Sequence, residues 1–94
     1  MTQQARLEAI VKGRVQGVGF RYHVSHRAKQ IGVTGYVRNL WDGSVEVVAE
    51  GDKTRLDQFL SYLQVGPRSA WVREVVTNWQ AASGKFNSFE VRSW

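Results

Sequence analysis

The chain contains no cysteine, a single proline and no hydrophobic run that approaches membrane length. Without cysteine it can form no disulfide bond, no thiolate metal site and no cysteine nucleophile, so a reducing cytoplasm is the expected compartment. Charged residues interrupt the apolar positions throughout the first twenty residues. We therefore expect neither a signal peptide nor a transmembrane helix, and no membrane partner.

The composition predicts one ordinary globular domain over residues 1–94. Hydrophobic residues make up 43% and charged residues 22% of the chain, which argues against the disordered and fibrous classes. A chain of 94 residues leaves no room for a second core. Four Trp, four Phe and three Tyr supply enough bulk to fill one core without cross-links.

The net charge of +5 is distributed unevenly. Residues 1–38 hold seven Lys or Arg against a single Glu, whereas residues 39–94 hold six basic and seven acidic residues. The positive potential therefore belongs to the N-terminal segment and favours an anionic ligand there. A substrate, a nucleic acid and simple solubility are all open explanations at this point.

Hydrophobic periodicity predicts five strands and two helices. Alternating apolar and polar residues indicate half-buried strands, whereas apolar residues at i, i+3, i+4 and i+7 indicate helices. The Asp42-Gly43 pair between two β-rich runs is the strongest hairpin signal, and Gly32 suits the position just past a helix end. The expected elements in chain order are strand 6–15, helix 21–31, strands 33–40 and 44–50, a helix from near Asp52 to Gly66-Pro67, and strands 70–79 and 89–92.

This β-α-β-β-α-β order, followed by a short terminal edge strand, predicts a fold of the α+β class. Right-handed connections of this kind give a ferredoxin-like sandwich, in which two helices cover one face of an antiparallel sheet. That architecture supports many unrelated functions, so the function has to be argued from the site.

The loop between the first strand and the first helix has features that suit a phosphate. Its run Val-Gln-Gly-Val-Gly-Phe-Arg occupies residues 15–21 and precedes a helix, whose positive end favours an anion. Gly17 and Gly19 allow a ligand oxygen to approach the backbone, and Arg21 adds a planar fork of donors. The glycine spacing matches neither the dinucleotide nor the Walker fingerprint, so a tight turn followed by a solvated arginine is an open alternative.

Asn39 is the second candidate, close to a strand end before the expected hairpin. Its side-chain amide offers one acceptor and two donors, which can hold a water molecule but cannot act as an effective base. A strand-end asparagine that satisfies local backbone groups is the common alternative.

Two segments together resemble the signature stretches of acylphosphatases. They are V-Q-G-V-G-F-R at residues 15–21 and G-Y-V-R-N-L-W-D-G-S-V-E-V at residues 35–47. The order and spacing of the elements over residues 6–92 are also similar. Trp41 departs from the pattern, since proline is expected there in many bacterial relatives, and this leaves the shape of the hairpin open.

The resemblance implies an enzyme that hydrolyses acyl phosphates to a carboxylate and inorganic phosphate, with no cofactor and no metal. It implies that Arg21 binds the phosphate and that Asn39 positions the attacking water. The backbone amides implied for the phosphate cradle are those of Gln16, Gly17, Val18, Gly19 and Phe20. The implied partner is a small-molecule acyl phosphate, and a monomer is the default state.

Other polar residues fit catalytic roles less well. His23 and His26 lie three residues apart on the first helix and lack a clear third ligand for a metal. The serines have no visible His–Asp arrangement that would make a triad. We expect the four Trp in the core or on a sheet face. We expect surface or capping positions for four acidic residues, Glu8, Glu46, Glu50 and Asp52.

Two rival functions are weighed against the enzyme. A nucleic-acid-binding module could use the same fold, with Tyr36, Trp71 and Trp79 stacking on bases, but the RNP1 pattern is absent and we expect no nucleic-acid partner. A non-catalytic module could sense phosphate, but simple anion capture has no need of a water-positioning Asn39.

Overall fold

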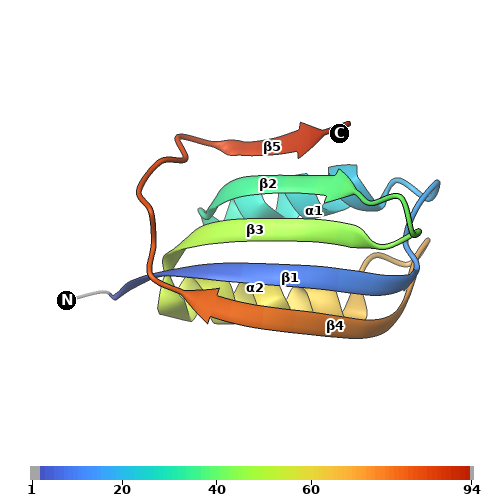
Figure 1. Ribbon diagram of the computed structural model, residues 1–94, viewed down its shortest axis with the longest axis horizontal. Helices are drawn as coiled ribbons and strands as arrows, with labels where there is room; N and C mark the ends of the chain where they lie inside the picture. The colour runs from blue at the N-terminus through green and yellow to red at the C-terminus, as the bar shows by residue number, and fades with distance from the viewer. Residues whose placement is uncertain (1–2, 94) are drawn as a thin grey trace.

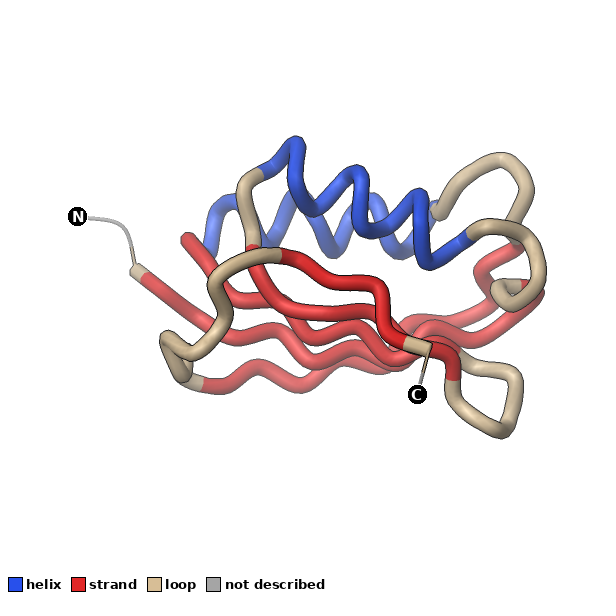
Figure 2. Tube along the Cα trace, turned by 90° about the horizontal axis from the view of Figure 1, so that it is seen from above, coloured by secondary structure: helices blue, strands red, loops and turns tan. Residues whose placement is uncertain are grey.

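A five-stranded sheet with two helices on one of its faces makes up the computed structural model, which describes residues 3–93 (Figure 1). Seen from above, the helices form one layer and the strands the other (Figure 2). All seven predicted elements are confirmed, and the residues 1, 2 and 94 of the predicted domain lie outside the described part. The elements are β1 (Gln4–Arg14), α1 (Phe20–Ile31), β2 (Thr34–Asn39), β3 (Val45–Asp52), α2 (Lys53–Val65), β4 (Trp71–Gln80) and β5 (Phe89–Arg92).

The sheet has the order β4-β1-β3-β2-β5. Its first four strands pair antiparallel, as predicted, but β5 runs parallel to β2 and makes the sheet mixed. The reason is geometric. The chain leaves β4 at one edge and crosses the end of the sheet to the other edge (Figure 1). It therefore returns opposite to β4, which is the direction of β2.

The core lies between the sheet and the two helices. Alternate residues of β1, namely Leu7, Ala9 and Val11, are fully buried on the helix side, in keeping with the period of a strand. The helices bury apolar residues at helical spacing, namely Phe20, Val24 and Ala28 from α1, and Leu56, Phe59 and Leu63 from α2. Phe89 of β5 joins this core through an edge-on contact with Phe59, at 5.8 Å between ring centroids. Because the buried Phe20 is the first residue of α1, its packing in the core holds the start of this helix against the sheet.

Neither of the described helices has the length and apolar character needed to cross a membrane.

The hairpin between β2 and β3 turns at Asp42-Gly43, as predicted. The Asp42 carboxylate accepts hydrogen bonds from the hydroxyl and the backbone N–H of Ser44, and these bonds lower its pKa below the ordinary value. The Leu40 N–H donates to the Ser44 carbonyl at 2.8 Å and closes the loop. Trp41 lies in this turn and is 98% exposed, so the expectation that the four Trp lie in the core or on a sheet face is wrong at this position.

The expectation for the acidic residues is confirmed at Asp52 and wrong at Glu50. Asp52 is the N-cap of α2, where its carboxylate accepts a hydrogen bond from the Thr54 N–H. Glu50 is only 4% exposed although its side chain points away from the helices. The reason is that the segment between β4 and β5 covers this end of the open sheet face, which is the face without helices. Ser83 and Gly84 of that segment bond to Glu50 although they are more than 30 residues away in sequence.

Candidate active site

The loop from residue 15 to residue 19 connects β1 to α1 and is shaped by two glycines. Gly17 and Gly19 have φ angles of 75° and 76°, in the left-handed region that other residues adopt only at a cost. A Cβ at Gly17 would meet no atom within 4 Å. Glycine is therefore required there by backbone conformation, and the space beside the loop is open to a ligand.

The backbone amides of this loop have no acceptor of their own. Within residues 3–93, no hydrogen bond runs from the N–H groups of residues 16–20 to another protein group. Gly19 is the N-cap of α1, and the helix start has neither a side-chain cap nor an acidic residue in its first turn. The positive end of the helix is therefore not neutralised by these residues, and the amides beside it are free to bind an anion.

Side chains from two other segments hold the loop in place. Gln16 Nε2 donates to the carbonyls of Leu40 and Ser44, both at 2.8 Å, which ties the loop to the β2–β3 hairpin. On its other side, the Ser69 hydroxyl donates to the Val18 carbonyl at 2.8 Å. Sequence reasoning assigned Gln16 only a backbone role and missed both ties, because their partners lie 24 to 51 residues away.

Arg21 lies in the first turn of α1, half-buried and directly after the loop. Its Nη1 donates to the backbone carbonyl of Arg92 in β5, at 2.8 Å. This bond uses one of the five N–H donors of the guanidinium, and within residues 3–93 the other four have no protein acceptor. Because Arg92 is the register partner of Arg38, the fork is held beside the end of β2.

Asn39 is the last residue of β2. It shares the parity of Gly35 and Val37, which are buried on the helix side, so its side chain faces the same side of the sheet as α1. Its Oδ1 is buried and has no hydrogen-bond partner among the described residues. An unpaired buried acceptor costs about 1–3 kcal/mol unless water or a ligand bonds to it.

Three features predicted from separate parts of the sequence thus meet at one end of the molecule. The loop contacts the hairpin that follows Asn39, and Arg21 bonds to the strand that pairs with β2. The arrangement combines free backbone amides, a planar cation and an unpaired amide oxygen. Chemically, it can bind a tetrahedral oxyanion and orient a small polar molecule beside it.

The other polar candidates are in ordinary surroundings. His23 and His26 are exposed on α1, and within residues 3–93 no cluster of three or more potential metal ligands exists. The Ser61 hydroxyl donates to the Asp57 carbonyl in its own helix. Ser25 is buried in α1.

The aromatic residues considered for base stacking do not form one platform. Tyr36 lies on the open sheet face, where the Arg92 guanidinium covers its ring at 4.0 Å and its hydroxyl bonds to Glu46. Trp79 is the register partner of Leu7 on the helix side, and Trp71 is 62% exposed at the start of β4. Trp94 lies outside the described residues.

The sequence and the fold have close counterparts among known proteins. The sequence model of the Acylphosphatase family matches residues 7–91. The chain is 52% identical over 82 residues to an acylphosphatase of Vibrio parahaemolyticus, covering 87% of this chain and 90% of that protein. It is 55% identical over 83 residues to one of Pasteurella multocida, covering 88% and 92%. The crystal structure of the Bacillus subtilis acylphosphatase superposes with a TM-score of 0.90 at 33% identity, over 94% of this chain and 98% of that one. The match to the family over nearly all of the described residues therefore shows that the chain belongs to the acylphosphatase family of hydrolases.

Proposed function

We propose that this protein hydrolyses acyl phosphates to a carboxylate and inorganic phosphate, using Arg21 and the amides of residues 16–20 to bind the phosphate. The observation that carries the proposal is the loop whose amides find no acceptor in the described part of the chain, at an uncapped helix start and beside a half-buried arginine. Each of these groups prefers the same ligand, an oxyanion with several acceptor atoms.

Acyl phosphates are activated anhydrides, so hydrolysis needs positioning and charge stabilisation more than a powerful nucleophile. In the proposed mechanism the guanidinium of Arg21 and the loop amides stabilise the phosphoryl oxygens as their charge changes. The carboxylate leaves from the side opposite the attacking water. A substrate phosphate oxygen takes the proton of that water, since no side chain at the site offers a suitable base.

Asn39 positions the attacking water in this proposal. Its unpaired Oδ1 accepts one hydrogen bond from the water and orients it towards phosphorus. All the groups used come from one chain, which suits a monomer, and the cysteine-free composition suits the cytoplasm.

The direct test is an assay of the hydrolysis of a small aromatic acyl phosphate, in which the disappearance of the anhydride is monitored. An aromatic phosphate monoester serves as the control substrate. We expect rapid release of phosphate from the anhydride and almost none from the monoester, because a poor leaving group needs a general acid that the site lacks. Equal rates on both substrates, or no hydrolysis of the anhydride, would contradict the proposal.

Inorganic phosphate should inhibit competitively, because product and substrate occupy the same cradle. Initial rates measured at several phosphate concentrations should show a rising apparent KM at constant kcat. Inhibition should weaken as the sodium chloride concentration is raised, because the basic N-terminal segment attracts phosphate electrostatically and salt screens this attraction. A phosphate series that leaves KM unchanged would mean that the loop is misassigned.

A chelator should not affect turnover, because Arg21 supplies the positive charge that a metal would otherwise bring to the phosphate. After incubation with a strong chelator and dialysis into metal-free buffer, we expect kcat within about twofold of the untreated enzyme. A lasting loss that one divalent metal restores would contradict this assignment.

A further inference from the structure

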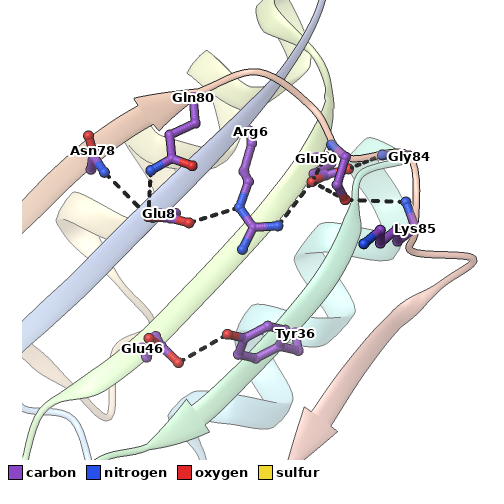
Figure 3. Close-up of polar contacts among 10 residues, drawn as sticks. Arg6, Glu8, Tyr36, Glu46, Glu50, Asn78, Gln80, Gly84 and Lys85 are labelled. Carbon is purple, nitrogen blue, oxygen red and sulfur yellow. Dashed lines mark hydrogen bonds and ion pairs between the residues drawn. The ribbon is translucent and has the colours of Figure 1, made fainter.

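Glu50, on the open face of β3, is an almost fully buried carboxylate with four hydrogen bonds (Figure 3). Its Oε2 accepts from Arg6 Nη1 at 3.1 Å, from the Ser83 N–H at 2.9 Å and from the Ser83 hydroxyl at 2.8 Å. Its Oε1 accepts from the Gly84 N–H at 2.9 Å. Burial raises the pKa of this carboxyl, but the hydrogen bonds from Ser83, Gly84 and Arg6 outweigh it and the pKa is lowered overall.

The partners of Glu50 belong to the segment that leads to β5. Residues 81–88 connect β4 to β5 across the end of the sheet and contain no helix or strand (Figure 1). The Arg6 guanidinium, held by Glu50, also lies over the ring of Phe86 in this segment, at 5.7 Å. Glu50 therefore fixes the middle of the connection through three of its four bonds.

The position of β5 matters to the site because β5 holds Arg21. This strand is only four residues long and pairs with β2 alone, at the edge of the sheet. Edge strands with one neighbour are among the elements that open most readily. The Arg92 carbonyl at its end is the only described acceptor that the Arg21 guanidinium bonds, so a displaced β5 would leave the fork free to swing.

We propose that Glu50 is a positioning residue for the phosphate-binding arginine, acting through the 81–88 segment and β5. The carboxylate anchors the segment, the segment fixes β5, and the Arg92 carbonyl orients Arg21 towards the cradle. This inference rests on the function proposed above for Arg21. Glu50 would thereby affect catalysis although its side chain lies at the opposite end of the sheet from the cradle.

The test compares Glu50→Ala with Glu8→Ala. Glu8 is a matched control because it also pairs with Arg6, at 2.8 Å, and bonds to Asn78 and Gln80 of β4, but forms no hydrogen bond or ion pair with the described residues 81–88 (Figure 3). We expect Glu50→Ala to lower kcat/KM by about tenfold or more and to weaken phosphate inhibition, since small misplacements of a binding group have effects of this size. Glu8→Ala should leave both within about twofold.

A double-variant cycle separates positioning from general destabilisation. In an Arg21→Ala background, adding Glu50→Ala should cause almost no further loss of kcat/KM, because the two changes act through the same group. All rates are measured well below the melting temperature of each variant. If Glu50→Ala does not fold, Glu50→Gln, which keeps one acceptor oxygen and the shape of the side chain, is judged by the same criteria.

A folded Glu50 variant with wild-type kcat/KM and phosphate inhibition would overturn this inference, as would losses that simply multiply in the double variant. If Arg21→Ala itself keeps wild-type activity, the proposed role of Arg21 fails and this inference falls with it, whereas the absence of anhydride hydrolysis in the wild type would contradict the proposed function itself. A large loss in Arg21→Ala with none in the Glu50 variants overturns the positioning role alone.

Discussion

Arg21→Ala should reduce kcat/KM by about a thousandfold and abolish measurable inhibition by phosphate. The guanidinium contacts the phosphoryl group before and during transfer, so its loss weakens binding as well as turnover, and single groups of this kind contribute on that scale. Arg21→Lys should also be poor, because a point charge cannot reproduce a planar fork that bonds Arg92 and the ligand together. Steady-state kinetics with a phosphate series measures both effects.

The matched control for this experiment is Arg27→Ala. Arg27 lies on the same helix, six residues further on, where it bonds to Gln30 and lies over the Tyr62 ring. The Arg27→Ala substitution removes the same charge without touching the cradle. We therefore expect kcat/KM to change by less than about threefold, through the general electrostatic field of the protein. Thermal unfolding should differ little between the two variants. Equal losses of kcat/KM in the two variants would mean that Arg21 contributes only its charge to the general electrostatic field and does not contact the phosphate.

Asn39→Ala should lower kcat by about a hundredfold while leaving the inhibition constant for phosphate almost unchanged. Asn39 is proposed to hold the water and not the phosphate, and removing one positioned polar group from an active site costs about this much. Because its buried Oδ1 has no partner among the described residues, truncation should leave the melting temperature unchanged or slightly higher. The measurements are kcat, the phosphate inhibition constant and thermal unfolding.

Asn78→Ala serves as the control for this variant. Asn78 lies in β4 on the open sheet face and bonds to Glu8, far in sequence from any residue of the cradle. Its replacement should leave kcat within about twofold. A near-normal kcat in Asn39→Ala, or a loss of fold, would show that the water-positioning role is wrong.

The elements of this fold could be predicted from sequence because their signals are local. Alternation in β1, helical spacing in α1 and α2, and the Asp42-Gly43 turn all act within a few residues. The direction of β5 was not given by any local pattern, since it depends on which edge of the sheet was left unpaired. Burial of Glu50 was missed for the same reason, because alternation assigns a face of the sheet but not what covers it.

The loop, Arg21 and Asn39 could be chosen as candidates from the sequence, but the contacts that hold the loop and Arg21 in place could not be predicted from it. Arg21 depends on a carbonyl 71 residues away, and Gln16 on carbonyls 24 and 28 residues away. Such bonds carry no signature in the local sequence, because any residue supplies a backbone carbonyl. The roles of Arg21 and Asn39 stay predictions until the variants are measured.

The proposed cradle consists of main-chain amides, and this has a consequence for how the gene can change over time. Substitutions at Gln16 or Val18, other than to proline, keep the backbone N–H, and any substitution at Arg92 keeps the C=O that bonds Arg21. The tightly restricted positions are those that set the path of the backbone, above all Gly17 and Gly19 with their positive φ, and the two side chains of the proposed site, Arg21 and Asn39. Most other residues around the cradle can therefore change by mutation while its anion-binding groups remain in place. The Bacillus subtilis acylphosphatase, with 33% identity and a TM-score of 0.90, shows that the backbone of this fold persists through extensive change of sequence.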